Sequence, residues 1–269
     1  MTDIYMADVS EFQANVDAPA YLKAGNQCII ARTYNGYRAD KQMYARRDYL
    51  RGQPFTGVGY YAYCAKDVDA TDQAHAFIQG IGQLKPNEWP ILDLEEGGGD
   101  QTGRADAWFR VVDNWAGFPA MLYTGASFLK TNLGGASRWQ GRPLWIASYP
   151  SSYQPSPSAE PSDPHLLWQF SDRYQFAGIG ACDGNVYHGT AQQFVTAARS
   201  SSGGTQPPTE DQIMALAACV ADNGTMHVFY EADDGSVWYT YQPKGKTDWN
   251  GGKPGKQLAG LSPFAPSPK

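Results

Sequence analysis

Long apolar runs, a basic surplus and a secretion signal are all missing from this 269-residue chain. No apolar run is long enough to span a bilayer, so we expect no membrane insertion. The 27 acidic residues outnumber the 21 basic ones and give a net charge of -6. Because phosphate binding needs a basic surface, this balance argues against nucleic acid as the main partner. Residues 1–5 show neither the basic nor the apolar segment of a secretory signal.

Cysteine and histidine are also scarce, with four of each. Cys28, Cys64, Cys182 and Cys219 form no CxxC pair and no zinc pattern, so buried free thiols are favoured over a disulfide framework. The histidines show no metal-ligand spacing either. We therefore expect no metal and no cofactor.

Aromatic residues are plentiful instead, at 13% of the chain, and they accompany a regular alternation of strands and helices. Hydrophobic patterning predicts strands at 4–9, 27–32, 57–63, 90–94, 120–123, 144–148, 166–170 and 185–187. It predicts helices at 18–24, 43–51, 69–84, 104–115, 127–132 and 191–198, with Asp69 as an N-cap. Such alternation indicates a parallel sheet, and eight strands indicate a closed barrel. The fold class is α/β, an irregular TIM-like barrel with few helices late in the chain.

The composition changes after this segment. Residues 200–209 are rich in serine, glycine and proline, as in a linker. Beyond them, 226–230 and 236–241 alternate like aromatic strands around an Asp233–Gly235 hairpin turn. We predict a barrel domain at 1–199, a linker at 200–209 and a small β-rich domain at 210–269.

Two acids at the end of the fourth predicted strand carry the most chemical information. Asp93 and Glu95 are separated by one residue, so on a strand they project to the same face while Leu94 points away. Side-by-side carboxylates repel, and one of them should keep its proton near neutral pH. A protonated acid beside an ionised one suits cleavage of a glycosidic bond. Glu96 faces the other way, and we expect it to be solvated or paired with a basic residue.

Two further acids lie near strand ends. Asp8 ends the first strand, and Asp183 precedes the last one. In a parallel barrel the first and last strands are neighbours, and active sites gather at the carboxyl ends. Asp8 fits that rule better than Asp183, and either residue alone could instead cap a helix or form an Asx turn.

The order of several motifs gives the chain a family resemblance. The motifs are Asp8-Val-Ser-Glu-Phe-Gln13, Asp93-Leu-Glu95, Leu122-Tyr-Thr124, Leu144-Trp-Ile-Ala-Ser-Tyr149, Leu167-Trp-Gln-Phe170 and Asp183-Gly-Asn185. Together, over residues 1–198, they resemble glycoside hydrolase family 25, the lysozymes of bacteria and bacteriophages. The resemblance implies hydrolysis of the peptidoglycan β-1,4 bond between N-acetylmuramic acid and N-acetylglucosamine.

The resemblance also implies roles for individual residues. Glu95 resembles the family's proton donor, and Asp93 the partner that stabilises the cationic state or orients the substrate acetamido group. Asp8 and Asp183 match its other active-site acids. The positions that line the sugar groove are matched by Tyr63, Tyr123, Trp145 and Gln169. One departure is Ala62, which stands where many members carry histidine and alters the expected groove wall.

The C-terminal segment looks like one blade of a tectonin-type β-propeller. A single blade buries little apolar surface, so it either packs on the barrel or assembles with blades of other chains. We hypothesise that it binds the cell wall through Trp238 and Trp249, although both could equally be core residues.

These inferences predict a phage endolysin that stays in the host cytoplasm until it is released to the wall. Two other classes remain open. One is a non-catalytic glycan-binding barrel, which would be expected to lose one acid of the pair. The other is a metal-dependent enzyme that uses the carboxylate cluster as ligands for Mg²⁺ or Mn²⁺.

Overall fold

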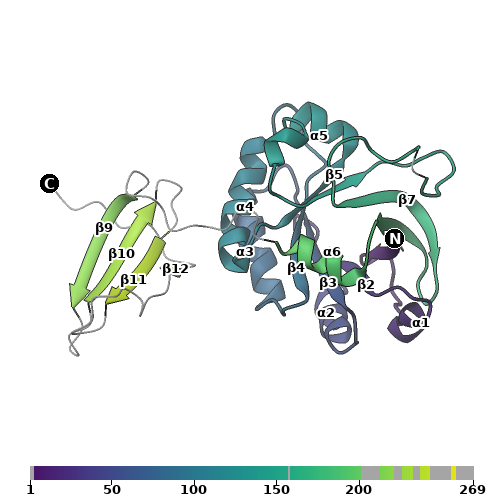
Figure 1. Cartoon of the computed structure of the whole chain (residues 1–269), viewed down its shortest axis with the longest axis horizontal. Helices are drawn as coiled ribbons and strands as arrows, with labels where there is room; N and C mark the ends of the chain where they lie inside the picture. Colours follow the sequence, from purple (N-terminus) through teal and green to yellow (C-terminus); the bar gives the residue numbers. More distant parts are fainter. Residues whose placement is uncertain are drawn as a thin grey trace. The chain divides into compact units, whose positions relative to one another are not determined.

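The chain divides into two compact units, Met1–Gly203 and Gly204–Lys269 (Figure 1). The computed structural model describes residues 3–156 and 158–200 in full. In the second unit it describes the backbone of residues 213–220, 226–232, 237–242 and 256–258.

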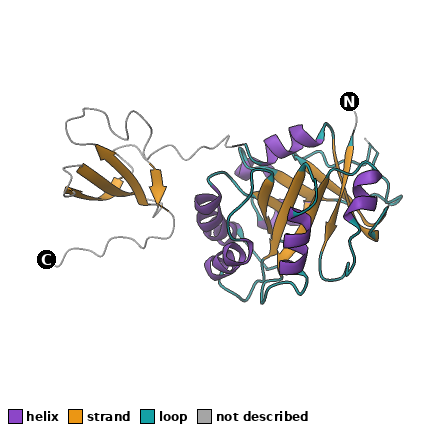
Figure 2. Cartoon of the chain, turned by 90° about the horizontal axis from the view of Figure 1, so that it is seen from below, coloured by secondary structure: helices purple, strands orange, loops and turns teal. Residues whose placement is uncertain are grey.

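Eight strands close the first unit into a barrel, in chain order from β1 to β8 (Figure 2). They are β1 Ile4–Val9, β2 Cys28–Tyr34, β3 Gly57–Tyr63, β4 Glu88–Asp93, β5 Met121–Gly125, β6 Leu144–Ala147, β7 Leu167–Phe176 and β8 Gly180–Tyr187. The predicted barrel is therefore confirmed. The prediction of a wholly parallel sheet is wrong at one strand, because β8 runs antiparallel to both β7 and β1.

Helices cover the outside of the barrel mainly over its first five strands (Figure 1). They are α1 Ala18–Lys23, α2 Met43–Arg51, α3 Ala70–Ile81, α4 Thr102–Ala116, α5 Ala126–Asn132 and α6 Ala191–Ala198, with a 3-10 helix, η1, at Ala136–Trp139. Asp69 caps α3 as predicted, since its carboxylate accepts the backbone N–H groups of Thr71 and Asp72. None of the helices in the described residues is both long and apolar enough to cross a bilayer.

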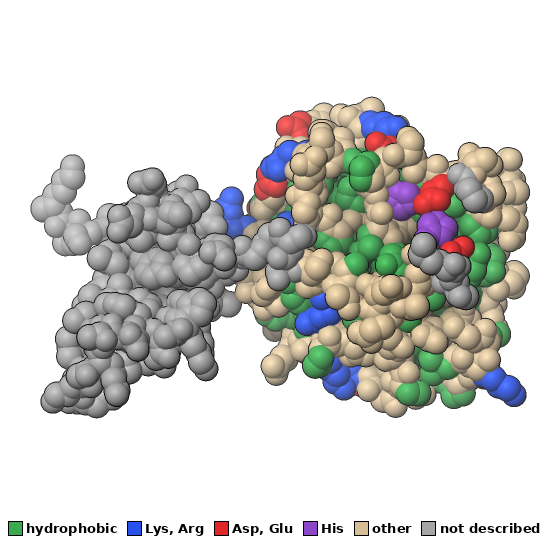
Figure 3. All heavy atoms as spheres, viewed as in Figure 1, with side chains coloured by type: hydrophobic (Ala, Val, Ile, Leu, Met, Phe, Trp, Pro, Cys, Tyr) green, Lys and Arg blue, Asp and Glu red, His purple; other side chains and the backbone are tan. Residues whose placement is uncertain are grey.

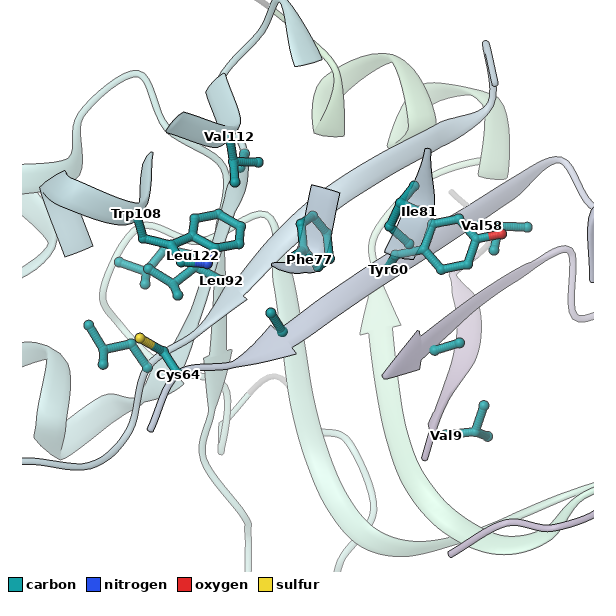
Figure 4. Close-up of a cluster of buried hydrophobic side chains, with 14 of the residues drawn as sticks. Val9, Val58, Tyr60, Cys64, Phe77, Ile81, Leu92, Trp108, Val112 and Leu122 are labelled. Carbon is teal, nitrogen blue, oxygen red and sulfur yellow. The ribbon is translucent and has the colours of Figure 1, made fainter. Parts of the chain in front are cut away.

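Alternation along the strands creates two apolar layers. Residues such as Met6, Ile91 and Met121 fill the barrel interior, and Phe194 of α6 closes it against Trp89 with ring centroids 5.3 Å apart. The intervening residues, including Leu92 and Leu122, pack outward against α3 and α4, as Figure 4 shows. Each fully buried side chain of this size contributes roughly 1.5–3 kcal/mol. The two layers fix the strands, and the strands carry the side chains at the mouth.

Glycine in β3 makes room for the interior side chain of Trp89. A Cβ built on Gly59 would lie 2.8–2.9 Å from indole atoms of Trp89. The strand can therefore pass beside the ring only because this position has no side chain.

Three of the four cysteines are buried free thiols, as expected: Cys28, Cys64 and Cys182. Burial raises the pKa of the Cys28 thiol to about 12, so it stays protonated. The side chain of Cys219 lies outside the described residues.

The second unit contains an antiparallel sheet in the order β12-β11-β10-β9. Its strands are β9 Ile213–Val220, β10 Met226–Ala232, β11 Val237–Gln242 and β12 Lys256–Leu258. Both strands expected from the aromatic alternation are present, as β10 and β11. Trp238 lies in β11 opposite Tyr230 of β10. The expected turn at 233–235 and Trp249 lie outside the described residues.

Candidate active site

Strand register brings the predicted site residues to one end of the barrel. Tyr63, Asp93, Tyr123 and Trp145 are successive Cα partners across β3, β4, β5 and β6. Residues paired in this way point to the same face of a sheet, and here that face is the barrel interior. Asp93 is the last residue of β4, so this row lies at the carboxyl ends of the parallel strands.

Asp183 reaches the same end by a different route from the one expected. It does not precede the last strand but lies within β8, directly opposite Asp8 of β1. Only residues 177–179 separate β7 from β8, and so short a connection can join antiparallel strands but not parallel ones. The first half of β8 therefore lies at the mouth, and Asp183 faces Asp8.

Asp8 is buried in a network of amide donors. Its Oδ2 accepts the side-chain N–H groups of Gln169 at 3.0 Å and Asn185 at 2.8 Å. Burial raises the pKa of Asp8, and hydrogen bonds from Asn185, Gln169 and Asp183 oppose that rise. Burial together with the Asp8 charge raises the pKa of Asp183 to about 9. At neutral pH the pair therefore holds one proton, on Asp183, which donates it to an ionised Asp8.

Asp93 is buried too, but it is short of partners. It is 5% exposed, and its Oδ1 has no hydrogen-bond partner in the described structure. Burial, with the charges of Glu95 and Asp8, raises its pKa well above the ordinary value. A buried carboxyl oxygen without a donor is costly in the free protein and is available to a ligand N–H or O–H.

Glu95 lies two residues beyond the end of β4, not on the strand as the sequence suggested. Its side chain is exposed. Partial desolvation raises its pKa, and the charges of Asp8 and Glu96 raise it further. The pair thus combines a buried Asp93 with an accessible Glu95. An accessible acid that retains its proton can serve as a general acid.

Of the residues predicted for the groove, Gln169 contacts Asp8 directly, and Tyr123 and Trp145 support that contact through Gln169 and Asn185. Tyr123 and Tyr149 both donate their hydroxyls to Oε1 of Gln169, at 2.9 and 2.6 Å. The Trp145 indole donates to Oδ1 of Asn185 at 2.8 Å. Tyr123, Trp145 and Gln169 are buried, so their contact with a sugar stays a prediction. Tyr149, 45% exposed, was not singled out, although it ends one of the quoted motifs.

One cation near the acids was also missed. Arg32 on β2 lowers the pKa of Asp93, against the larger effects of burial and the neighbouring acids. Its guanidinium pairs with Asp40 at 2.9 Å and Glu11 at 3.2 Å. The alternation along β2 could have placed Arg32 in the barrel interior, because it comes two residues after interior Ile30 and is the Cα partner of Tyr61.

No histidine in the part of the barrel unit that the structure describes is bonded to these acids. Glu160 bridges His165 and His188, at 3.0 and 3.1 Å, and His188 also contacts Asp3. Figure 3 shows histidine side chains beside acidic ones on the visible face. Within residues 3–200, no group of three or more His, Cys, Asp or Glu side chains is arranged to hold a metal ion.

An α/β barrel with acids gathered at the carboxyl ends of its strands supplies the paired carboxylates that cleavage of a glycosidic bond needs. The chain belongs to the glycosyl hydrolases family 25, whose family model matches residues 7–179. The protein is therefore an enzyme of the glycoside hydrolase class. Few of its barrel strands are followed by long helices, in keeping with the solved structures it resembles.

Comparisons with known proteins give a sequence relative and solved structures with the same fold. The uncharacterized protein YegX of Escherichia coli is 29% identical over 200 residues, which span 71% of each chain. The bacterial lysozyme from Streptomyces coelicolor is 19% identical with a TM-score of 0.63, over 75% of this chain and 100% of that one. The catalytic domain of endolysin ply40, from bacteriophage P40 of Listeria monocytogenes, is 22% identical with a TM-score of 0.61. The match covers 74% of this chain and 98% of that one.

Proposed function

We propose that this protein is a peptidoglycan hydrolase that cleaves the β-1,4 bond between N-acetylmuramic acid and N-acetylglucosamine. The observation that carries the proposal is the convergence of Asp8, Asp93, Glu95 and Asp183 at one barrel mouth. Membership of a family whose solved relatives include lysozymes supports the choice of substrate.

Glu95 is the general acid of the proposed reaction. It is the most accessible of the four acids, and its raised pKa keeps a proton available for the leaving oxygen. Ionised Asp8 supplies part of that rise, and its own charge is held by Gln169 and Asn185. The amide network therefore acts on catalysis through the charge of Asp8.

Asp93 assists the reacting sugar. An acetamido N–H of the substrate would give its Oδ1 the missing hydrogen-bond partner. A donor of this kind favours the ionised carboxylate, which then stabilises the positive charge that develops on the sugar. Two routes remain: attack by the substrate's own acetamido oxygen, with Asp93 holding the N–H, or direct attack by Asp93.

Digestion of purified peptidoglycan tests the assignment. The wild type should create new reducing ends on muramic acid, and Glu95→Gln should abolish them, because an amide cannot donate an acidic proton. Asp106→Asn is a matched control, since Asp106 is an exposed acid on α4 paired with Arg138. Activity that survives Glu95→Gln would overturn the assignment. Loss of wild-type activity in EDTA would favour the metal-dependent alternative, and intact binding without cleavage would favour a glycan-binding barrel.

We further propose that the protein acts as a phage endolysin, held in the host cytoplasm until it reaches the wall. The structural similarity to a phage endolysin supports this role. The C-terminal unit would bind the wall, and its four-stranded antiparallel sheet has the architecture of a propeller blade. Self-association through this unit is a second possible use of such a sheet.

Co-sedimentation with purified cell walls tests the C-terminal unit. A chain that ends at residue 200 should lose binding while it still cleaves soluble glycan fragments. Full-length Trp238→Ala and Trp249→Ala variants report whether either indole contributes. Unchanged sedimentation of the shortened chain would refute a wall-binding role, and a concentration-dependent mass of the full chain would instead indicate self-association.

A further inference from the structure

Glu95 has little of its own to hold it in place. It follows the end of β4, its side chain is exposed, and its carboxyl has no hydrogen-bond partner among residues 3–200. A general acid must nevertheless stay within hydrogen-bond reach of the leaving oxygen. The backbone on either side of Glu95 must therefore fix its position.

The preceding residue is fixed by the barrel. The Leu94 N–H donates to the carbonyl of Tyr123 at 3.1 Å, and the Leu94 carbonyl accepts the hydroxyl of Thr124 at 2.7 Å. Leu94 is also fully buried. Both of its backbone groups thus extend the contact with β5 past the end of the strand.

The following residue, Glu96, is held by its side chain and its backbone together. Its Oε1 accepts the backbone N–H of Lys66 at 2.7 Å, and its carboxylate also accepts the hydroxyl of Tyr63. Its carbonyl accepts Nη1 of Arg104 at 3.1 Å, and Nη2 of Arg104 donates to the Cys64 carbonyl at 2.6 Å. Glu96 is therefore tied both to the end of β3 and to α4.

The chain turns away immediately after Glu96. Gly97 has φ of +116°, a conformation that side chains disfavour, and a Cβ there would lie 2.8 Å from the side chain of Gln101. Glu96 is thus the last residue before the turn that can hold Glu95.

We propose that Glu96, held by Tyr63, Lys66 and Arg104, is the residue that positions Glu95 for proton donation. This inference rests on the proposed function of Glu95 and adds a role for its neighbour. It also replaces the sequence-based expectation for Glu96, because the carboxylate is neither simply solvated nor paired with a basic side chain; it accepts a backbone N–H and a tyrosine hydroxyl.

Glu96 has a second, electrostatic effect on the same group. Its negative charge raises the pKa of Glu95, alongside burial and Asp8. The other titratable groups that interact with Glu95 come from the strands and loops around the mouth: Asp93, Asp183, Tyr63, Tyr123 and Tyr149. Tyr63 is also a partner of Glu96, and a glutamine at position 96 keeps an acceptor oxygen while it removes the charge. Placement and charge can therefore be separated by the choice of substituent.

Two substitutions at residue 96 separate the effect of placement from the effect of charge. Glu96→Gln keeps an acceptor oxygen for Lys66 N–H and Tyr63 but removes the charge. We expect kcat on peptidoglycan to stay within about threefold at the optimum, while the alkaline limb of the pH profile moves to lower pH. Glu96→Ala removes the acceptor as well, and we expect kcat to fall about 100-fold with little change in KM, since a misplaced acid loses rate rather than binding.

Controls keep this test distinct from that of the proposed function. Arg104→Ala should lower kcat in the same way as Glu96→Ala, and Asp106→Ala on the outer face of α4 should not. Thermal unfolding of each variant shows whether a loss of activity comes from a loss of folding. If Glu96→Ala or Arg104→Ala fails to fold, the pH profile of Glu96→Gln tests the inference instead. An active wild type and inactive Glu95→Gln, combined with unchanged kcat and pH profile in the Glu96 variants, would overturn this inference alone. An inactive wild type would overturn the proposed function itself.

Discussion

Asn185 offers the sharpest test of how the acid cluster is held. Its side chain is fully buried and makes three hydrogen bonds. Nδ2 donates to Asp8 at 2.8 Å and to the Met6 carbonyl at 3.0 Å, while Oδ1 accepts the Trp145 indole at 2.8 Å. Asn185→Asp preserves the shape and the acceptor for Trp145, but it removes both donors and adds an acid beside Asp8.

The cost of this substitution should depend on pH. An ionised carboxylate at position 185 would be a buried charge without a compensating partner, facing another carboxylate, and such charges cost about 3–5 kcal/mol. Burial raises the folded-state pKa of such an acid above its unfolded value. The destabilisation is therefore small below the unfolded pKa, near about 4, and grows as pH rises toward the folded pKa. In its protonated form the introduced carboxyl can also restore one donor to Asp8.

Urea unfolding at pH 4 and pH 8 measures the difference. We expect Asn185→Asp to lose at least about 3 kcal/mol more, relative to wild type, at pH 8 than at pH 4. Asn35→Asp is the matched control, because Asn35 lies in a loop and uses only its acceptor oxygen, toward Tyr37 and Arg38. An equal loss at both pH values would refute the electrostatic reasoning and leave only a packing effect.

Three other substitutions test the barrel and its acids. Arg51→Met leaves Glu88, 1% exposed, without its partner at 2.8 Å, so urea unfolding should show a loss of about 3–5 kcal/mol; a loss below about 1 kcal/mol would contradict a compensating role. Gly59→Ala forces a Cβ against Trp89 and should cost about 1–3 kcal/mol in the same assay, whereas unchanged stability would mean that the ring moves freely. Asp183→Asn removes an acid that titrates near 9 when folded, so the unfolding temperature should fall less than that of wild type as pH rises from 5 to 9. Parallel curves for the two proteins would argue that this proton is not retained on folding.

Much of the barrel could be predicted because its signals are local. Hydrophobic patterning placed the strands β1 and β3 and the helices α2 and α6 at their observed bounds. The Asp69 cap of α3 needs only residues two and three positions ahead. The last strand was harder to predict from the sequence. β8 begins at Gly180, but the sequence predicted a strand only at Asn185–Tyr187, because Asp183 and Gly184 have low strand propensity.

The candidate site was predicted as a list of residues but not as an arrangement. Nothing near Gln169 in the sequence shows that it joins Asp8 to Tyr123 and Tyr149, since Asp8 and Tyr123 lie on other strands and Tyr149 lies beyond the end of β6. Likewise, Arg32 contacts Glu11 only after β1 and β2 have paired. Contacts across the barrel depend on closure, which local patterns do not encode.

The sequence by itself determined the alternating strands, the acids at their ends and the spacing of Asp93 and Glu95, because strand period and turn chemistry are properties of neighbouring residues. Only the tertiary structure decided how those acids differ. Closing the barrel buries Asp93 and Asp8, sets Asp183 against Asp8 on a reversed strand, and leaves Glu95 accessible beyond β4. Burial and the neighbouring charges are set by residues far apart in the chain, and they decide which acid keeps its proton.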